Sequence, residues 1–281
     1  MTAVLALLAV ALSPEAPRRI VTLAPSCAEI VSALGLEDRI VGVTDFTDWP
    51  ERVKPLPRVG SYVSFSIEAV AALHPDLVVA TDDGNPPAAL RRIERLGIRV
   101  ETLRLRGYRD IEHAIELLGT AVGRAAQAQR VVAEMDRVAR CVAVRTKDVP
   151  RPRVLFAYEV SPIVSAGRGT LTDEIVAMAG GISVTHDVAT EYPRLNAESV
   201  IARAPEVVIV SSMNPALDTT RWRAWMARWP SIPAVATGRV HVIESTNVDR
   251  PSQRVVLGLT LLARTIHPVL FAHGECDAAA P

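Results

Sequence analysis

Short apolar runs alternate along most of the chain with longer segments of helical periodicity. The apolar runs predict buried strands at 19–24, 40–43, 76–80, 98–103, 153–158, 207–211 and 240–244. Helical spacing predicts helices at 26–35, 87–96, 171–179 and 251–266. Strands that alternate with helices indicate mostly parallel sheets covered by helices. In the first helix, Ser26 and Glu29 fit the capping-box pattern of a helix start.

The segment 110–147 contains no proline, and its apolar residues recur at helical spacing. Gly119 and Gly123 weaken the middle of this pattern, and we expect them not to break it. One helix over the whole segment would span about 57 Å, which is longer than one small domain. We therefore expect a single long helix to connect two halves of the molecule. The tail from His267 is expected to be frayed.

The two halves of the sequence repeat one another. The segment 66–78 matches 196–208: each has a capping residue, then Glu, a helix, Pro, an acid and a strand. A second match joins Glu29-Ile30-Val31, followed by Gly35, to Glu174-Ile175-Val176, followed by Gly180. Any α/β unit can produce one such match, but two in the same order favour a duplicated pair of lobes.

Composition narrows the class of protein. The 281 residues carry 31 Lys and Arg against 31 Asp and Glu, so the formal net charge is zero, which argues against a nucleic-acid binder. Apolar residues make up 49%, as in a folded globular chain. The three cysteines, Cys27, Cys141 and Cys276, have no metal-like spacing, and their odd number excludes complete pairing.

The first apolar run, 3–12, is too short to span a bilayer, which takes about 20 residues. It is similar to the apolar core of a secretory signal, with 9–11 as a small-residue cleavage site, although no Lys or Arg precedes it. We expect an exported, periplasmic protein. The other interpretation is a frayed apolar terminus.

No enzyme motif stands out. The chain has no Gly-x-Gly-x-x-Gly after a strand, no phosphate-binding loop with Lys and no Gly-x-Ser-x-Gly. The histidines are scattered, and only His186 lies in a loop that a ligand would reach. We therefore expect no catalytic residues, no metal site and no resident cofactor.

Aromatic residues make up only 4% of the chain, yet several lie in loops at strand ends, where α/β folds bind ligands. They are Phe46, Trp49, Tyr62, Phe65 and Tyr192. Ordinary anchoring against the core explains any one of them. Together they predict a cleft with aromatic walls, suited to a large planar ligand. Asp249 and Arg250, before the last helix, offer hydrogen bonds to such a ligand, although Asp249 also fits a helix cap before Pro251.

At this point the sequence resembles a known family. The residues that carry the resemblance are the Arg-Ile-Val-Thr-Leu-Ala-Pro-Ser opening at 19–26, Ser-Ile-Glu and His-Pro-Asp-Leu-Val-Val within 66–79, Asp83-Gly84-Asn85, and Tyr192-Pro193 followed by Asn196-Ala197-Glu198. With the long middle helix, they resemble the periplasmic binding proteins with two lobes joined by one helix, and most of all the cobalamin (vitamin B12) receptors of ABC importers. Siderophore and haem receptors share much of this pattern.

The resemblance implies a site between the lobes. By position, Pro25, Phe46, Tyr62 and Tyr192 would line the cleft, and Asp249 and Arg250 would meet the polar edge of a corrinoid. Tyr62 and Tyr192 stand where the cobalamin receptors lead us to expect Trp, Phe46 where we expect Tyr, and Val164 where we expect Phe. The cleft is therefore expected to be less aromatic, and the preferred corrinoid to differ.

The resemblance also gives a role to the repeated Glu. Glu68 and Glu198 match the carboxylates, one on each lobe, that contact arginines of the permease. An acid at either position also complements a helix dipole, worth about 0.3–1 kcal/mol, and that effect alone explains both. Two equivalent carboxylates, one on each lobe, would align the receptor on the permease and guide their encounter more than they would strengthen the binding.

We thus predict an α/β protein with two Rossmann-like lobes, parallel central sheets and one long connecting helix. The expected divisions are a signal or apolar tail (1–17), an N-terminal lobe (18–108), a linking helix (109–149), a C-terminal lobe (150–270) and a tail (271–281). The predicted function is a monomeric, non-enzymatic receptor that delivers cobalamin or a related corrinoid to an ABC permease, with modest lobe movement. The alternatives are a haem or ferric-siderophore receptor, a corrin- or porphyrin-modifying enzyme, and a binding protein without a transporter.

Overall fold

Two β-sheets, one in each half of the chain, organise the molecule, and the first is wholly parallel. The computed structural model describes residues 16–160, 162–212 and 215–278. The first sheet has the order β2-β1-β3-β4, and all its neighbouring strands run parallel. Its strands are β1 (Ile20–Thr22), β2 (Ile40–Gly42), β3 (Leu77–Thr81) and β4 (Arg99–Leu103). Each was predicted from its apolar run.

The second sheet has the order β10-β9-β5-β6-β8, and β7 also pairs with β5. The strands are β5 (Arg153–Val160), β6 (Ile163–Ser165), β7 (Ile182–Ser183), β8 (Arg194–Leu195), β9 (Val207–Ser212) and β10 (Val240–Glu244). Strands β5, β7, β9 and β10 pair in parallel, whereas β6 is antiparallel to both β5 and β8. The mostly parallel sheet was predicted, but the antiparallel edge is too short to be read from periodicity.

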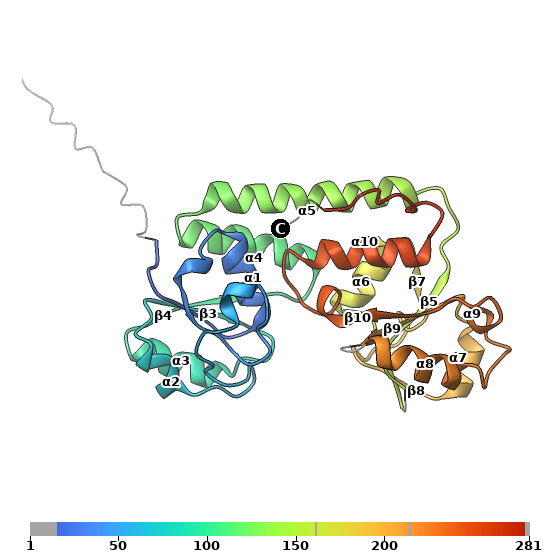
Figure 1. Cartoon of the computed structure of the whole chain (residues 1–281), viewed down its shortest axis with the longest axis horizontal. Helices are drawn as coiled ribbons and strands as arrows, with labels where there is room; N and C mark the ends of the chain where they lie inside the picture. The colour runs from blue at the N-terminus through green and yellow to red at the C-terminus, as the bar shows by residue number, and fades with distance from the viewer. Residues whose placement is uncertain (1–15, 161, 213–214, 279–281) are drawn as a thin grey trace, which may run out of the picture.

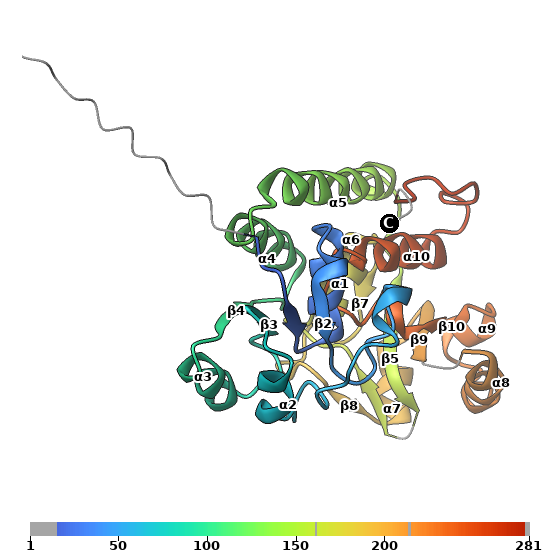
Figure 2. The same cartoon turned by 60° about the vertical axis from the view of Figure 1, so that its left-hand side comes forward.

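Helices cover both faces of each sheet (Figure 1). They are α1 (Pro25–Ala33), α2 (Ile67–Ala72), α3 (Pro87–Arg95), α4 (Tyr108–Ala121), α5 (Ala125–Thr146), α6 (Leu171–Met178), α7 (Ala197–Arg203), α8 (Pro215–Met226), α9 (Pro233–Ala236) and α10 (Val255–Ile266), with 3₁₀ turns η1 (Glu37–Arg39), η2 (Glu51–Val53) and η3 (Ser245–Asn247). Helix α5 runs along one side of the whole molecule, and α2 and α7 lie on the opposite side in both views (Figures 1 and 2). No helix in the described part of the chain is long and apolar enough to cross a membrane.

The expectation of one continuous helix over 110–147 is wrong, because the segment forms two helices, α4 and α5. Gly123 adopts a left-handed conformation (φ 71°) just after α4, which is the usual place for glycine at a helix end. A Cβ on Gly119 would lie 2.4 Å from the Cβ of Ala128, so glycine lets the two helices pack closely. The two glycines turn the chain back, and α5 alone forms the long connection.

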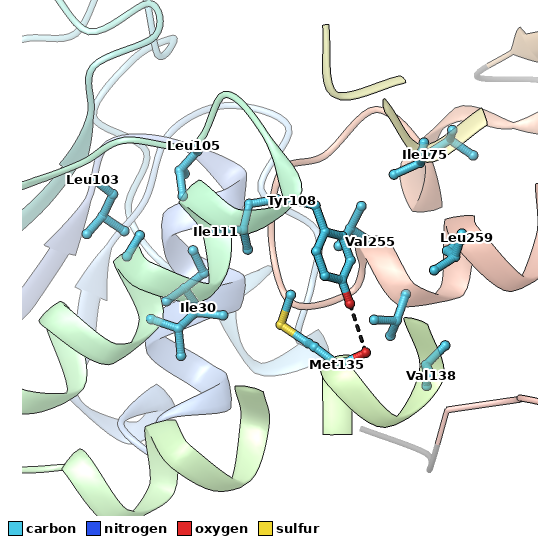
Figure 3. Packing of buried hydrophobic residues seen from close by; sticks show 14 of the residues in the cluster. Ile30, Leu103, Leu105, Tyr108, Ile111, Met135, Val138, Ile175, Val255 and Leu259 are labelled. Atoms are coloured by element: carbon cyan, nitrogen blue, oxygen red, sulfur yellow. Dashed lines mark hydrogen bonds between the residues drawn. The ribbon is translucent and has the colours of Figure 1, made fainter. Parts of the chain in front are cut away.

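One hydrophobic core continues through both halves. It joins Ile30 of α1 and Ile111 of α4 to Met135 of α5, and then to Ile175 and Leu259 of α6 and α10 (Figure 3). All of these side chains are almost completely buried. An apolar core across the junction of two lobes resists their separation, because opening it would expose apolar surface at a cost of about 25 cal/mol per Å². Modest lobe movement on ligand binding therefore stays our expectation.

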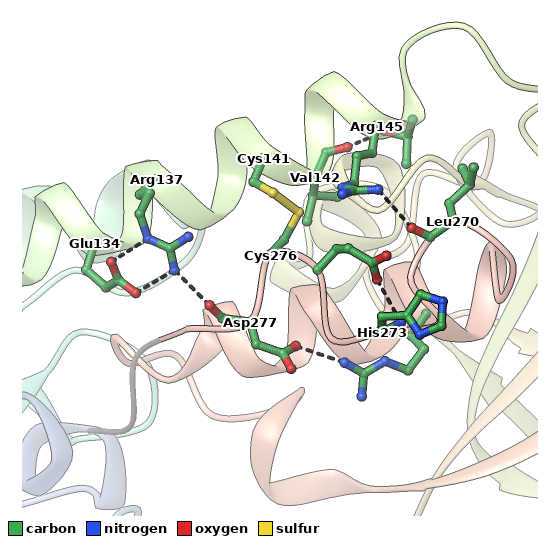
Figure 4. Close-up of a disulfide and its surroundings, with 12 residues drawn as sticks. Glu134, Arg137, Cys141, Val142, Arg145, Leu270, His273, Cys276 and Asp277 are labelled. Carbon is green, nitrogen blue, oxygen red and sulfur yellow. Dashed lines mark hydrogen bonds and ion pairs between the residues drawn. A yellow bond between two sulfur atoms is a disulfide. The ribbon is translucent and has the colours of Figure 1, made fainter.

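The expected fraying of the tail from His267 is wrong. Phe271 is buried in the core, and a disulfide joins Cys276 to Cys141 of α5 (Figure 4). Arg137 donates to the backbone carbonyl of Asp277 at 2.7 Å, and Arg264 pairs with its carboxylate at 2.8 Å. The disulfide, the ion pair between Arg264 and Asp277 and the buried Phe271 together hold the tail in place. The remaining cysteine, Cys27, is buried and unpaired.

Candidate binding cleft

A cavity of about 410 Å³ lies where residues of both lobes meet. Asp83, Leu105 and Arg106 enter it from the N-terminal half, after β3 and β4. The C-terminal half contributes Tyr158, Val164, Gly169, Thr170, Leu171, Thr172, Glu191, Tyr192, Val248, Asp249 and Pro251. The volume falls within the range of small-molecule sites, about 300–1,000 Å³. A larger ligand would be enclosed in part and would extend along the rim.

Two tyrosines form the aromatic wall of the C-terminal lobe. The ring centroids of Tyr158 and Tyr192 lie 6.0 Å apart, and Tyr158 packs edge-on against Phe156 behind it. The Tyr158 hydroxyl donates to Thr172 at 2.8 Å. Tyr192 is 54% exposed, so much of its side chain is accessible at the surface of the cleft. Tyr158 was not among the predicted site residues, because it lies within the apolar strand β5 and the sequence pattern alone does not show which strand residue faces a cleft.

Tyr62 is held on the N-terminal rim by its neighbours. Gly84, with φ 96°, lies under the ring, and a Cβ there would be 2.2 Å from the Tyr62 side chain. The buried amide of Asn85 donates to the carbonyls of Tyr62 and Leu23 at 2.6 and 2.9 Å. Its oxygen accepts from the backbone N–H of Thr81. The Asp83-Gly84-Asn85 motif therefore positions an aromatic ring, with Tyr62 still 46% exposed.

Phe46 projects further outward and is 75% exposed. Its backbone is left-handed (φ 61°), which is uncommon for a bulky side chain. Arg58 holds the loop by donating to the carbonyls of Thr44 and Thr47 at 3.0 and 2.8 Å. The loop is therefore supported by hydrogen bonds while the Phe46 ring stays accessible to solvent.

The charged groups that line the cavity are mainly acidic. Asp83, Glu191 and Asp249 contribute carboxylates, while the cation, Arg106, pairs with Asp82 at 3.4 Å. Surrounding protein partly desolvates Asp249 and raises its pKa to about 6, although a hydrogen bond from Ser211 at 2.6 Å opposes this shift. Carboxylates at a cleft wall accept hydrogen bonds well and repel anionic ligands.

The two phenols of the cleft resist ionisation. Burial raises the pKa of Tyr158 well above its ordinary value, and the negative charge of Asp249 adds to the effect. Burial also raises the pKa of Tyr192, and the charges of Asp83 and Glu191 act in the same direction. Both rings therefore remain neutral and serve as flat apolar surfaces with a polar tip.

Of the six residues predicted to contact ligand, Tyr192 and Asp249 line the cavity. Tyr62 and Phe46 lie in exposed loops outside its lining, and Pro25 is half-buried at the first position of α1. Arg250 is engaged elsewhere: its guanidinium donates to Glu29 at 3.1 Å and to Asp48 at 2.5 Å. The structure thus brings together part of the predicted set.

The capping box predicted at Ser26 and Glu29 is wrong. Helix α1 begins at Pro25 with no side-chain cap, and Glu29 is completely buried, with its carboxylate directed to the other lobe. His186 is also outside the cavity lining and pairs with Asp173 at 2.8 Å. Among the described residues, no group of three or more His, Cys, Asp or Glu is placed to hold a metal ion.

Known proteins resemble this chain over most of its length. Residues 20–246 match the periplasmic binding protein family. A vitamin B12-binding protein of Vibrio cholerae is 29% identical over 245 residues, which covers 86% of this chain and 87% of the relative. The relatives found by sequence are binding proteins.

Two solved structures show the same fold. The periplasmic haem-binding protein RhuT of Roseiflexus sp. RS-1, in its apo form, superposes with a TM-score of 0.80 and 26% identity, covering 90% of this chain and 99% of its own. The periplasmic vitamin B12-binding protein BtuF of Vibrio cholerae superposes with a TM-score of 0.79 and 25% identity, covering 90% of this chain and 98% of its own.

Proposed function

This chain belongs to the periplasmic binding protein family, and we propose that it captures cobalamin or a related corrinoid between its lobes for an ABC importer. The acidic, aromatic cleft is the observation that carries this choice of ligand. A corrin ring offers a flat apolar face to tyrosines, and the amide groups at its edge donate hydrogen bonds to carboxylates such as Asp249. The corrinoid is cargo, and the proposal includes neither a resident cofactor nor a catalytic step.

Haem is the second candidate, because a haem-binding protein shares the fold and two phenols line the cleft. Two features weigh against it. Haem carries two carboxylates, which the acidic lining would repel. A tyrosine that ligates ferric iron does so as phenolate, and the raised pKa of Tyr158 and Tyr192 disfavours that form.

Calorimetric titration of the purified protein with cyanocobalamin, and separately with haemin, tests the proposal. We expect saturable one-to-one binding of cyanocobalamin that raises the melting temperature, as linkage requires. Haemin should bind at least about a hundredfold more weakly, a difference of about 2.7 kcal/mol. Tighter binding of haemin would assign the cleft to the second candidate, and binding of neither would refute the corrinoid assignment.

We also propose that Glu68 and Glu198 contact the permease. Each lies in the first turn of a short helix, α2 or α7, on the side of the molecule opposite α5 (Figure 2). The caps Ser66 and Asn196 each accept from a backbone N–H of their helix, at 3.0 and 2.8 Å. Glu68 is 81% exposed at its side chain, so it is accessible to a partner.

The double variant Glu68→Ala, Glu198→Ala should bind cyanocobalamin like the parent and lose most uptake with the cognate permease. The matched control is Glu37→Ala, Glu116→Ala, which removes two exposed carboxylates from other surfaces. Uptake that survives in the first variant would reject the contact. Equal loss in both variants would indicate a general charge effect.

An extracytoplasmic location follows from the same proposal. The Cys141–Cys276 disulfide is suited to an oxidising compartment, since disulfides are rare in reducing cytosol. The signal-like segment 3–12 lies outside the described residues. Secretion of a fusion reporter carrying residues 1–17 would support export, and retention of the reporter in the cytosol would contradict it.

A further inference from the structure

We propose that Glu29 and Glu174 act as a matched pair of positioning residues that fix the spacing of the two lobes at the cleft. This inference deepens the proposed function and rests on it for its consequence in ligand binding. Each glutamate lies in a helix of one lobe and accepts hydrogen bonds from residues at or just before the start of a helix of the other lobe.

Glu29 of α1 has no exposed surface. Its carboxylate accepts from the hydroxyl of Ser252 and from the guanidinium groups of Arg250 and Arg254, at 3.1 and 3.2 Å for the two arginines. Arg250 also pairs with Asp48 of the N-terminal half at 2.5 Å. A buried carboxylate is tolerated only with such partners, so the pairing is enforced by the cost of leaving it unpaired.

Glu174 of α6 makes the reciprocal contact. Its carboxylate accepts from the backbone N–H of Tyr108 at 2.8 Å, at the start of α4. Gly107 is the N-cap of α4 and supplies no capping side chain, so the other lobe provides the cap. A Cβ on Gly107 would lie 2.9 Å from the Glu174 carboxylate, which explains glycine at this position. The helix dipole favours the negative charge there.

The two contacts are equivalent in the internal repeat. Glu29-Ile30-Val31 and Glu174-Ile175-Val176 are the matching segments of the two halves. Their partners also correspond in place: Tyr108 is the first residue of α4, the helix after β4, and Arg250, Ser252 and Arg254 lie just before α10, the helix after β10. Matching residues of the two halves therefore each hold a contact to the other lobe, Glu29 through side-chain donors and Glu174 through a backbone N–H.

Both contacts lie directly beside the cleft. Thr172, two residues before Glu174, and Arg106, two residues before Tyr108, line the cavity. Asp249 and Pro251, which flank Arg250, line it from the other segment. A change at either glutamate would therefore alter the distance between cleft walls without removing a ligand contact.

Distance measurement between spin labels tests this directly. Ala88 and Ala236 are exposed, one in each lobe, and take labels after substitution by Cys, while Cys27 is buried. We expect a narrow distance distribution in the labelled parent and broader ones in Glu29→Gln and Glu174→Ala. Glu174→Gln keeps an oxygen acceptor for Tyr108 and should restore the narrow distribution. The exposed Glu94→Gln serves as the control.

Affinity for cyanocobalamin should fall by about two- to thirtyfold in Glu29→Gln and Glu174→Ala, the range expected when a coupled positioning contact is lost. Unchanged distributions in both variants would overturn the inference, even with lower melting temperatures. If Glu29→Gln does not fold, the result for Glu174→Ala decides whether the inference holds. Glu174 is only half-buried, so its replacement should be tolerated by the fold. Failure of the parent to bind cyanocobalamin would refute the ligand and leave the distance test intact.

Discussion

Removal of the disulfide should destabilise the folded protein without affecting ligand binding. The bond links residues 135 positions apart, so it restricts a very long loop in the unfolded chain. Loop-closure entropy for such a loop corresponds to about 5 kcal/mol at 25 °C. Measured values usually fall between about 2 and 5 kcal/mol. We expect Cys141→Ser, Cys276→Ser to lose an amount in that range.

The structure shows why the loss acts mainly through the unfolded state. In the folded protein the tail keeps its other contacts with the body. Arg145 donates to the carbonyl of Leu270 at 3.2 Å (Figure 4), Arg264 pairs with Asp277 at 2.8 Å, and Phe271 is buried. The tail should therefore remain in place after the bond is cut. Phe271→Ala provides the contrast, because it removes packing and should cost about 3–5 kcal/mol even with the disulfide intact.

Urea unfolding with and without reductant measures the effect. Reductant should lower the unfolding midpoint of the parent to that of the Ser/Ser variant and leave the variant itself unchanged. Cyanocobalamin affinity should be equal in both, since the bond lies on α5, away from the residues that line the cleft. A variant as stable as the parent, or one that loses affinity with stability intact, would refute the reasoning.

Two further predictions concern the cleft. The pKa of Asp249 is raised from 3.8 to about 6 in the folded protein, so ionisation of this group lowers the stability of the fold above pH 6 and has no effect below pH 3.8. Asp249→Asn should therefore be more stable than the parent at pH 7 and equally stable near pH 3.5. Urea unfolding measures both stabilities, with the exposed Asp148→Asn as the control. The ionised carboxylate is a stronger acceptor than the neutral acid, so cyanocobalamin affinity should fall as pH drops through 6 in the parent and stay flat in Asp249→Asn. Tyr192→Ala should weaken cyanocobalamin binding by about tenfold or more, because one aromatic wall of the cleft is lost. Calorimetry compares this variant with Val269→Ala, which changes an exposed apolar residue near the C-terminus. Equal affinity in the two variants would place the ligand elsewhere.

The lobes were predictable because local patterns determine them. Each apolar run formed its strand, and the match between 66–78 and 196–208 became helices α2 and α7 with Ser66 and Asn196 as caps. These features depend on neighbours a few residues apart, whose effects are visible in the sequence. Periodicity did not reveal the break at Gly123, because left-handed glycine at a helix end and glycine tolerated inside a helix look alike in one sequence.

Contacts between distant segments were not predictable in the same way. Glu29 fits a capping box by spacing, yet its partners Arg250 and Arg254 lie more than 220 positions away. Arg250 was assigned to the ligand from its loop and by resemblance, and the structure shows that its guanidinium has two carboxylate partners, which the sequence did not indicate. Tyr158 carries no sequence signal apart from its strand. Residue type and spacing indicate which groups are available, but only the fold decides which of them meet.

The fold alone does not determine which ligand binds. A haem-binding and a vitamin B12-binding protein superpose on this chain almost equally well, with TM-scores of 0.80 and 0.79. The side chains of the cleft must therefore discriminate between ligands, and we propose that they do so by charge. Carboxylates at Asp83, Glu191 and Asp249 favour a ligand whose edge donates hydrogen bonds over one whose edge is anionic. Replacement of these acids by amides should thus narrow the difference between cyanocobalamin and haemin more than any change to the aromatic rings.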